Sequence, residues 1–181
     1  MDVQSPQNVK YFIALLSAQK TDLDETLGLC QDAFGPLDLM GEAHPFDQTN
    51  YYETEMGTDL VRRILGFERL QSPGLMAPFK LLCNDIEAKT SRVGKRQVNL
   101  DLGYLDLHKL VLASAKYNGQ KIYLDQGIYA DTTLLFQSGK FVSLPNTFPD
   151  FKSGAYDDEL MELRAMYKRQ LKDFNSAADS H

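Results

Sequence analysis

One segment, FDQTNYYETEMG at 46–57, gathers acidic, hydroxyl and phenol side chains that could do chemistry. If the chain is extended from Tyr51 onward, Tyr51 and Glu55 share one face, because side chains alternate along a strand. A carboxylate flanked by phenols can act as a general base or a metal ligand, and phenols can donate hydrogen bonds to an oxyanion. Glu55 is therefore a candidate catalytic residue, and Tyr51 and Tyr52 are candidate ligand-binding residues. An edge strand with a solvated acidic face explains the same residues without a site.

A second segment, QVNLDLGYL, places Asn99 and Asp101 on the face opposite its apolar residues. Polar groups on an otherwise apolar strand need hydrogen-bond partners when they point inward. Lys95 and Arg96 precede this strand in a basic turn, where they could attract a phosphate or a carboxylate. Asp101 could then orient a metal ion, a ribose hydroxyl or a substrate proton. A solvated surface turn is the competing interpretation of the cations.

A third segment, IYLDQGIYADTTLLF, alternates Tyr129 and Asp131 with apolar residues. If its strand pairs with the strand that carries Asp101, the two aspartates lie close together. Carboxylates that converge with Lys or Arg suit a divalent cation such as Mg²⁺ and a phosphate group. An antiparallel sheet that exposes a polar face to water gives the same alternation, and only the strand register decides between the two.

These segments supply the candidate site. The candidate catalytic residues are Glu55, Asp101 and Asp131, and the candidate ligand-binding residues are Tyr51, Tyr52, Lys95, Arg96, Asn99, Tyr104 and Tyr129. No metal ligands are assigned. A further polar stripe on a predicted helix, Lys80, Asn84 and Glu87, is typical of a solvent-exposed face, although it could close over the sheet.

Strand and helix patterns alternate in the first hundred residues. An almost continuous apolar run predicts a central strand at 9–17 that is covered on both faces. Capping residues before apolar residues at helical spacing predict two helices, from Asp22 to Phe34 and over about 74–91. The other predicted strands lie at 37–44, 51–56, 60–67 and 97–105, and 51–56 and 60–67 form a hairpin unless 60–67 is a helix.

The remaining sequence predicts more strands and a last helix. The strands lie at about 110–114, 121–124, 127–136 and 141–144, and the helix spans 157–174. The order strand, helix, strand, strand, helix, strand is that of a ferredoxin-like βαββαβ core. The predicted fold class is therefore α+β, with this core extended by antiparallel strands and a C-terminal helix. Residues 1–174 are expected to form one domain, and 175–181 a disordered tail.

The composition is typical of a globular protein, with 181 residues, 43% of them hydrophobic and 24% charged. The net charge of −6 argues against nucleic acid and anionic lipid as partners. Cys30 and Cys83 each lie in a helical apolar pattern, as expected for core residues in a reducing compartment. The polar residues 1–8 lack a signal-peptide pattern, and the longest apolar run, 11–16, is too short to span a bilayer. We therefore expect a cytoplasmic protein.

The chain resembles a known family in four segments that keep their order and spacing. They are PFDQTNYYETEMG at 45–57, GKRQVNLDLGYL at 94–105, IYLDQGIYADTTLLF at 122–136 and NTFPDF at 146–151. Together they resemble the signature segments of a bacterial and archaeal family, domain of unknown function 4416. The resemblance extends from about Val9 to Tyr167. It implies no activity, although some members carry an automatic label of GTP-binding protein.

A P-loop GTPase mechanism is excluded by the sequence. The chain has no G-x-x-x-x-G-K-[ST] motif. Neither Gly94-Lys95-Arg96 nor Gly139-Lys140-Phe141 has the preceding glycine or the following hydroxyl residue that this motif requires. Nucleotide binding by other residues stays open.

We therefore expect a protein that binds, and could process, a small anionic metabolite or nucleotide. The site would be a pocket on the sheet face, lined by carboxylates, tyrosines and Lys or Arg, with Mg²⁺ as a candidate cofactor. Whether the protein is an enzyme stays open. The alternative is a non-catalytic protein-interaction module, which would present a flat or convex polar surface instead of a concave pocket.

Overall fold

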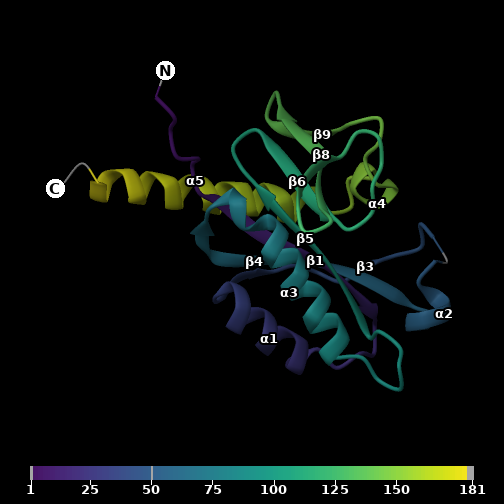
Figure 1. The fold of residues 1–181 in the computed structure, drawn as a ribbon. Coiled ribbons are helices and arrows are strands. Elements are labelled where there is room, and N and C mark those ends of the chain that lie inside the picture. The colour runs from purple at the N-terminus through teal and green to yellow at the C-terminus, as the bar shows by residue number, and fades with distance from the viewer. Residues whose placement is uncertain (1, 50, 179–181) are drawn as a thin grey trace.

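The chain folds into one large antiparallel sheet with helices packed on it, an α+β architecture (Figure 1). The computed structural model describes residues 2–49 and 51–178, and side chains up to residue 174. Its strands are β1 (Val9–Ala18), β2 (Leu37–Met40), β3 (His44–Pro45), β4 (Leu60–Gln71), β5 (Val98–Leu105), β6 (Lys109–Ser114), β7 (Ile122–Asp125), β8 (Ile128–Gln137) and β9 (Lys140–Ser143). Its helices are α1 (Asp24–Phe34), α2 (Glu53–Met56), the 3-10 helix η1 (Pro73–Leu75), α3 (Met76–Lys89), α4 (Pro149–Lys152) and α5 (Asp157–Ala178).

The strands follow the order β2-β4-β1-β5-β6-β8-β7, with β3 beside β4 and β9 beside β8. Every pair is antiparallel. Helices α1 and α3 cover one face of the sheet, and α5 crosses the other face (Figure 1). The sheet is therefore the middle layer of three along most of β1 and β4.

The central strand β1 supplies both cores, because its side chains alternate between the two faces. Tyr11 and Ile13 pack in the core that contains α1 and α3, whereas Phe12 and Ala14 pack in the core that contains α5. Residues 9–17 are all buried. The predicted strand with two covered faces is thus confirmed.

The hairpin predicted for residues 51–67 is wrong in its first arm. Tyr51 and Tyr52 form a turn and Glu53–Met56 is the short helix α2, so Tyr51 and Glu55 do not share a strand face. Gly57, whose φ is 89°, ends the helix and donates its backbone N–H to the Glu53 carbonyl. The second arm is confirmed as the strand β4 and is not a helix.

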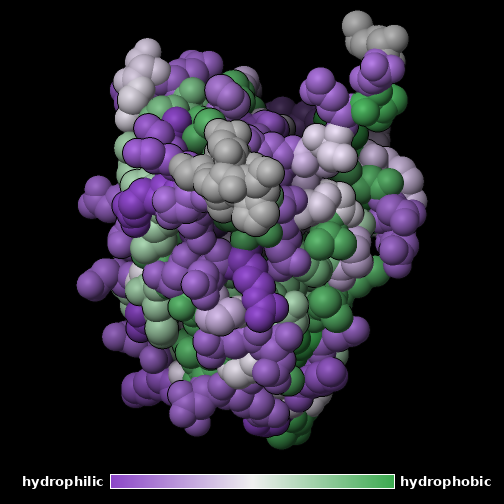
Figure 2. Space-filling view, turned by 90° about the vertical axis from the view of Figure 1, so that its left-hand side faces the viewer, coloured by the Kyte–Doolittle hydropathy of each residue, from purple (hydrophilic) through white to green (hydrophobic). Residues whose placement is uncertain are grey.

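Two other boundaries differ from the predicted ones. The predicted strand at 37–44 is divided into β2 and β3, which both pair with β4. Helix α5 continues to Ala178, so 175–178 is helical where a disordered tail is expected, and 179–181 lie outside the described residues. The face from which α5 projects is mostly hydrophilic, with apolar residues scattered over it (Figure 2). No helix in the described part of the chain is long and apolar enough to cross a membrane.

Candidate functional site

The neighbouring strands β5 and β6 pair along part of their length and separate toward the start of β5. Strand β5 pairs with β1 over Val98–Leu105, but its described pairing with β6 covers only Gly103–Leu105. Beyond that point the backbone of Leu100 bonds to two side chains of α3. Its N–H donates to Glu87 Oε1 at 2.7 Å, and its carbonyl accepts from Lys80 Nζ at 2.8 Å. Two helix side chains thus take the place of a neighbouring strand.

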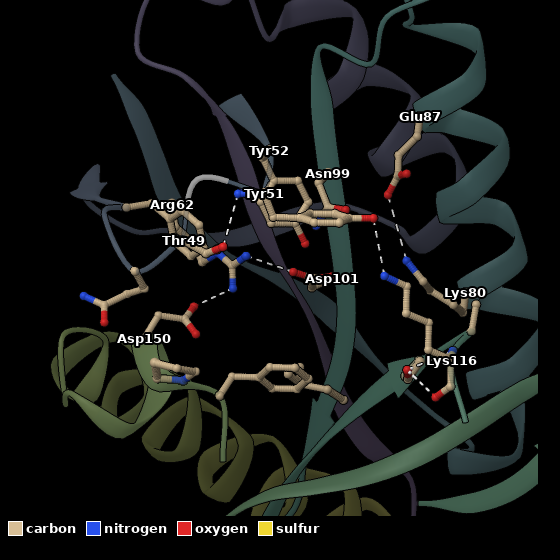
Figure 3. A pocket seen from close by; sticks show the side chains of 18 of the residues that line it. Thr49, Tyr51, Tyr52, Arg62, Lys80, Glu87, Asn99, Asp101, Lys116 and Asp150 are labelled. Atoms are coloured by element: carbon tan, nitrogen blue, oxygen red, sulfur yellow. Dashed lines mark hydrogen bonds and ion pairs between the residues drawn. The ribbon is translucent and has the colours of Figure 1, made fainter. Parts of the chain in front are cut away.

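A cavity of about 400 Å³ opens where these strands separate (Figure 3). Its walls come from six parts of the chain: the segment before α2, β4, α3, the start of β5 with the segment before it, the end of β6 with the segment after it, and the start of α4 with the residue before it. Its charged lining residues are Arg62, Lys80, Arg96, Lys116, Lys121, Glu87, Asp101 and Asp150, and its aromatic lining residues are Phe46, Tyr51, Tyr52 and Phe148.

Arg62 of β4 lines the cavity and is 4% exposed. Its guanidinium donates to Asp150 Oδ2 at 2.6 Å and to Asp101 Oδ2 at 2.9 Å, as Figure 3 shows. Burial lowers the pKa of Arg62, but the carboxylates of Asp101 and Asp150 raise it by more, so the group stays charged. The ring of Phe46 packs 4.7 Å from the guanidinium carbon. Arg62 therefore joins β5 and α4 and holds both carboxylates.

Arg96 also lines the cavity and joins α2, α3 and β5. Its Nε and Nη2 donate to the two oxygens of Glu55 at 2.9 and 2.7 Å. Its Nη1 contacts Glu87 Oε2 at 3.4 Å and Asn99 Oδ1 at 3.2 Å. The hydrogen bond from Arg96 lowers the pKa of Glu55. Both Glu55 oxygens are thus engaged by the guanidinium of Arg96.

Two lysines line the side of the cavity formed by the end of β6 and the segment after it. Lys116 Nζ lies 3.5 Å from Tyr51 Oη and 4.9 Å from the centre of the Tyr51 ring. Among the described residues it has no carboxylate partner. Lys121 Nζ donates to Ser114 Oγ at 2.8 Å and lies 3.7 Å from Asp131 Oδ2. Lys116 is thus the cavity cation most accessible to a ligand.

The aromatic side chains form a connected group beside these cations. The ring of Tyr52 makes edge contacts with Phe46 and Tyr51, at centroid distances of 6.1 and 5.0 Å. Burial, with a contribution from the charge of Asp101, raises the pKa of Tyr52 to about 12. The Tyr52 phenol therefore keeps its proton at neutral pH and is available as a hydrogen-bond donor.

The structure brings together part of the predicted site. Tyr51, Tyr52, Arg96, Asn99 and Asp101 all line the cavity. Glu55 and Asp131 do not line it, but each contacts a cation that does, Arg96 and Lys121 respectively.

Three predicted ligand-binding residues lie elsewhere. Lys95 is exposed in a turn that an isolated β-bridge between Arg92 and Lys95 closes. Tyr104 is on the face of the sheet that α1 and α3 cover, and its ring lies 5.9 Å from the ring of Tyr11. Tyr129 packs against the rings of two other tyrosines near β7, Tyr117 and Tyr123.

The three candidate carboxylates pair with three different cations. Glu55 pairs with Arg96, Asp101 with Arg62, and Asp131 with Lys121. Strand β6 lies between β5 and β8, so the strands that carry Asp101 and Asp131 are not neighbours. No group of three or more potential metal-ligating side chains occurs in the part of the chain that the structure describes.

Sequence reasoning missed several cavity residues. The stripe of Lys80, Asn84 and Glu87 is typical of a solvent-exposed face, but the structure has the alternative in which it closes over the sheet, with Lys80 7% and Glu87 6% exposed. Lys80 and Glu87 are seven residues apart, so they lie on the same helix face about two turns from each other. This spacing is the signal that both side chains can reach the same strand edge. Arg62 also carries a signal, because it is a charge inside the apolar run of β4.

Comparison with protein families gives one match over most of the chain. A family model described as "Domain of unknown function (DUF4416)" matches residues 7–167. No curated protein and no solved structure matches the chain significantly. The matched range includes every residue that lines the cavity.

Proposed function

The chain belongs to the family DUF4416, and we propose that it binds a small anionic metabolite in the cavity between β5 and β6. The observation that carries this proposal is the charge of the lining. Five Lys or Arg residues and three carboxylates line the cavity, and the carboxylates of Glu55 and Asp131 pair with two of these cations from outside the lining. Among the described residues, Lys116 is the lining cation without a carboxylate partner, and a cation in this position favours an anion beside it.

The contacts of the cations support a phosphate or carboxylate group near Lys116. Arg62 and Arg96 are held by carboxylates, and Lys121 lies near Asp131. Within the described part of the chain, the Lys116 ammonium instead contacts only the hydroxyl and ring of Tyr51. Its ammonium can therefore exchange a weak contact for a charge-assisted hydrogen bond to the ligand.

The size and walls of the cavity agree with a small organic ligand. About 400 Å³ lies within the range of small-molecule sites, which combine apolar walls with a few placed polar groups. The two tyrosines and Phe148 supply apolar walls, and Asn99 and Ser114 supply polar groups. Binding, with or without a chemical step, is the function that this arrangement supports best.

Thermal denaturation with phosphorylated metabolites, with and without Mg²⁺, tests the proposal. Ligand-dependent stabilisation is expected for the wild-type chain and is expected to weaken in Lys116→Gln. Lys89→Gln is the matched control, because Lys89 lies exposed on α3 and outside the cavity lining. No stabilisation by any phosphorylated or carboxylated metabolite, under either condition, would contradict the proposal.

We also propose the finer classification of the fold, a ferredoxin-like unit in residues 9–105. The order β2-β4-β1-β5 of its four main strands supports it, as does the position of α1 and α3 on one face. An experimental structure that gave a parallel pair among these strands would contradict this classification.

A second candidate function, protein interaction, has its own supporting observation at the far end of the sheet. Among the strands that the structure describes, β7 pairs only with β8, and it exposes Ile122, Tyr123 and Leu124. A free edge with apolar side chains favours strand pairing with another chain, here a second copy of this protein. Sedimentation velocity tests it: a dimer that dissociates in Ile122→Lys supports the candidate, and a monomer at high concentration contradicts it.

A further inference from the structure

Asn99 has a buried hydrogen-bond donor without a partner at the cavity wall. The residue is 6% exposed and lines the cavity, and its Nδ2 is buried with no hydrogen-bond partner in the described part of the chain. A buried donor without an acceptor destabilises the free protein. Unpartnered buried donors are rare in folded proteins, so each one requires an explanation. One explanation is that the donor bonds to a ligand when the ligand binds.

The orientation of this amide is determined by its neighbour. Asn99 Oδ1 lies 3.2 Å from Arg96 Nη1. A guanidinium can only donate, so the group that faces Arg96 must be the amide oxygen, and the NH₂ group must point elsewhere. Glu55 holds Arg96 through two hydrogen bonds, with a further contact from Glu87. Asn99 is therefore held in position as a donor.

An aromatic wall lies beside this donor. The Tyr52 ring centre lies 6.0 Å from the Arg96 guanidinium carbon, so Tyr52 and Asn99 flank the same arginine. Tyr52 and Asn99 both line the cavity, where Figure 3 labels them. A planar ring can stack on aromatic side chains while an acceptor at its edge reaches a neighbouring amide.

We infer that Asn99 is a specificity-determining residue, which donates from Nδ2 to an acceptor on a planar ring of the ligand. This inference rests on the proposed anion-binding function and deepens it. The ligand class is an anion that carries a planar ring with a carbonyl or ring-nitrogen acceptor, as in a nucleoside phosphate. Its anionic group lies toward Lys116, and its ring lies against Tyr52.

Three probes separate the parts of this inference. Ribose 5-phosphate carries the anion alone, phenyl phosphate adds a ring without an acceptor, and uridine 5′-monophosphate adds a ring with carbonyl acceptors. Titration calorimetry is expected to give the highest affinity for uridine 5′-monophosphate. In Asn99→Leu, the affinity for uridine 5′-monophosphate should fall about tenfold, toward the affinity for phenyl phosphate. The affinity of this variant for phenyl phosphate should equal that of the wild type. Asn8→Leu, at an exposed position before β1 and outside the cavity lining, is the matched control and should preserve the difference between the two probes.

A second measurement does not depend on a variant. In the wild-type chain, the side-chain amide protons of Asn99 should shift in the NMR spectrum when uridine 5′-monophosphate is added, and not when phenyl phosphate is added. If all probes bind equally and the Asn99 amide does not shift, the role of Asn99 is overturned while anion binding stands. If none of the three probes binds, anion binding in this cavity and the role of Asn99 are both overturned.

Discussion

Lys80 and Glu87 lie two helical turns apart on α3 and bond to the backbone carbonyl and N–H of one residue, Leu100. Their charged groups are 3.9 Å apart. This pair completes the edge of β5 at the point where β6 leaves it. The cavity exists because a helix, and not a strand, satisfies this backbone.

Removal of one member of this pair should therefore be costly. Glu87→Ala is expected to lower the free energy of unfolding by about 3 kcal/mol, because it leaves Lys80 buried without its partner and Leu100 N–H without an acceptor. Urea unfolding measures this loss. The loss in the double variant Lys80→Ala/Glu87→Ala should be smaller than the sum of the two single losses. Glu162→Ala, exposed on α5, is the control, and an equally small loss in Glu87→Ala and Glu162→Ala would contradict the prediction.

Arg62 should be at least as important for stability. Arg62→Met leaves Asp101 and Asp150 without their shared cation and should lower the free energy of unfolding by roughly 3–5 kcal/mol. Addition of Asp150→Asn to this variant should raise the free energy of unfolding part of the way back toward the wild-type value, because it removes one unpaired charge. A double-mutant cycle by urea unfolding checks both statements. Strict additivity of the two substitutions would show that Arg62 and Asp150 are not coupled.

The Glu55–Arg96 pair predicts a pH dependence of stability. The pKa of Glu55 is lowered from its ordinary 4.5 by the hydrogen bond from Arg96, so the folded state favours the carboxylate. The resulting stabilisation is present above about pH 4.5 and is lost as the pH falls through the lower, folded-state pKa. Urea unfolding from neutral to acidic pH should show a steeper acid loss in the wild type than in Glu55→Gln. Parallel profiles in the two proteins would disprove this contribution.

Glu87 should show the opposite sign. Burial raises its pKa, the contributions of Lys80 and the Leu100 N–H lower it, and the raising effect is the larger. The folded state therefore binds the proton more tightly than the unfolded chain. The stabilisation from this group is present below the unfolded-state pKa and is lost as the pH rises through the folded-state pKa. In Glu87→Gln the free energy of unfolding should accordingly fall less between acidic and neutral pH than in the wild type, and a larger fall would contradict the raised pKa.

Two glycines give a matched test of the packing. A Cβ at Gly66 of β4 would lie 2.3 Å from Leu163 Cδ2 of α5 and 3.0 Å from Leu39 Cβ, so Gly66→Ala should cost about 1–3 kcal/mol. Gly28 is exposed on α1, and a Cβ there meets nothing within 4 Å. Gly28→Ala should stabilise by roughly 0.4–1 kcal/mol. Thermal or urea unfolding compares the two, and a stabilised Gly66→Ala variant would contradict the close contact between β4 and α5.

Local patterns predicted the elements well where one periodicity dominates. The apolar run of β1, the stripes of α1 and α3, and the alternation of β5 all lie close to their predicted positions. The segment 51–56, which contains α2, could not be predicted in this way, because so short a pattern fits a strand and a helical turn equally. Burial of Met56 against Leu16 and Leu60 accompanies the helical form.

Local patterns were enough to name the candidate side chains on β5 and the face of the strand that they occupy. Alternation along a strand and proximity in the chain are local properties, and they place Asn99, Asp101 and Arg96 together at the cavity. Which distant groups meet these residues depends on the folded arrangement. Arg62, Asp150 and the Lys80–Glu87 pair reach β5 through strand order, register and helix packing. These depend on contacts between residues far apart in the chain, and no local pattern encodes such distances.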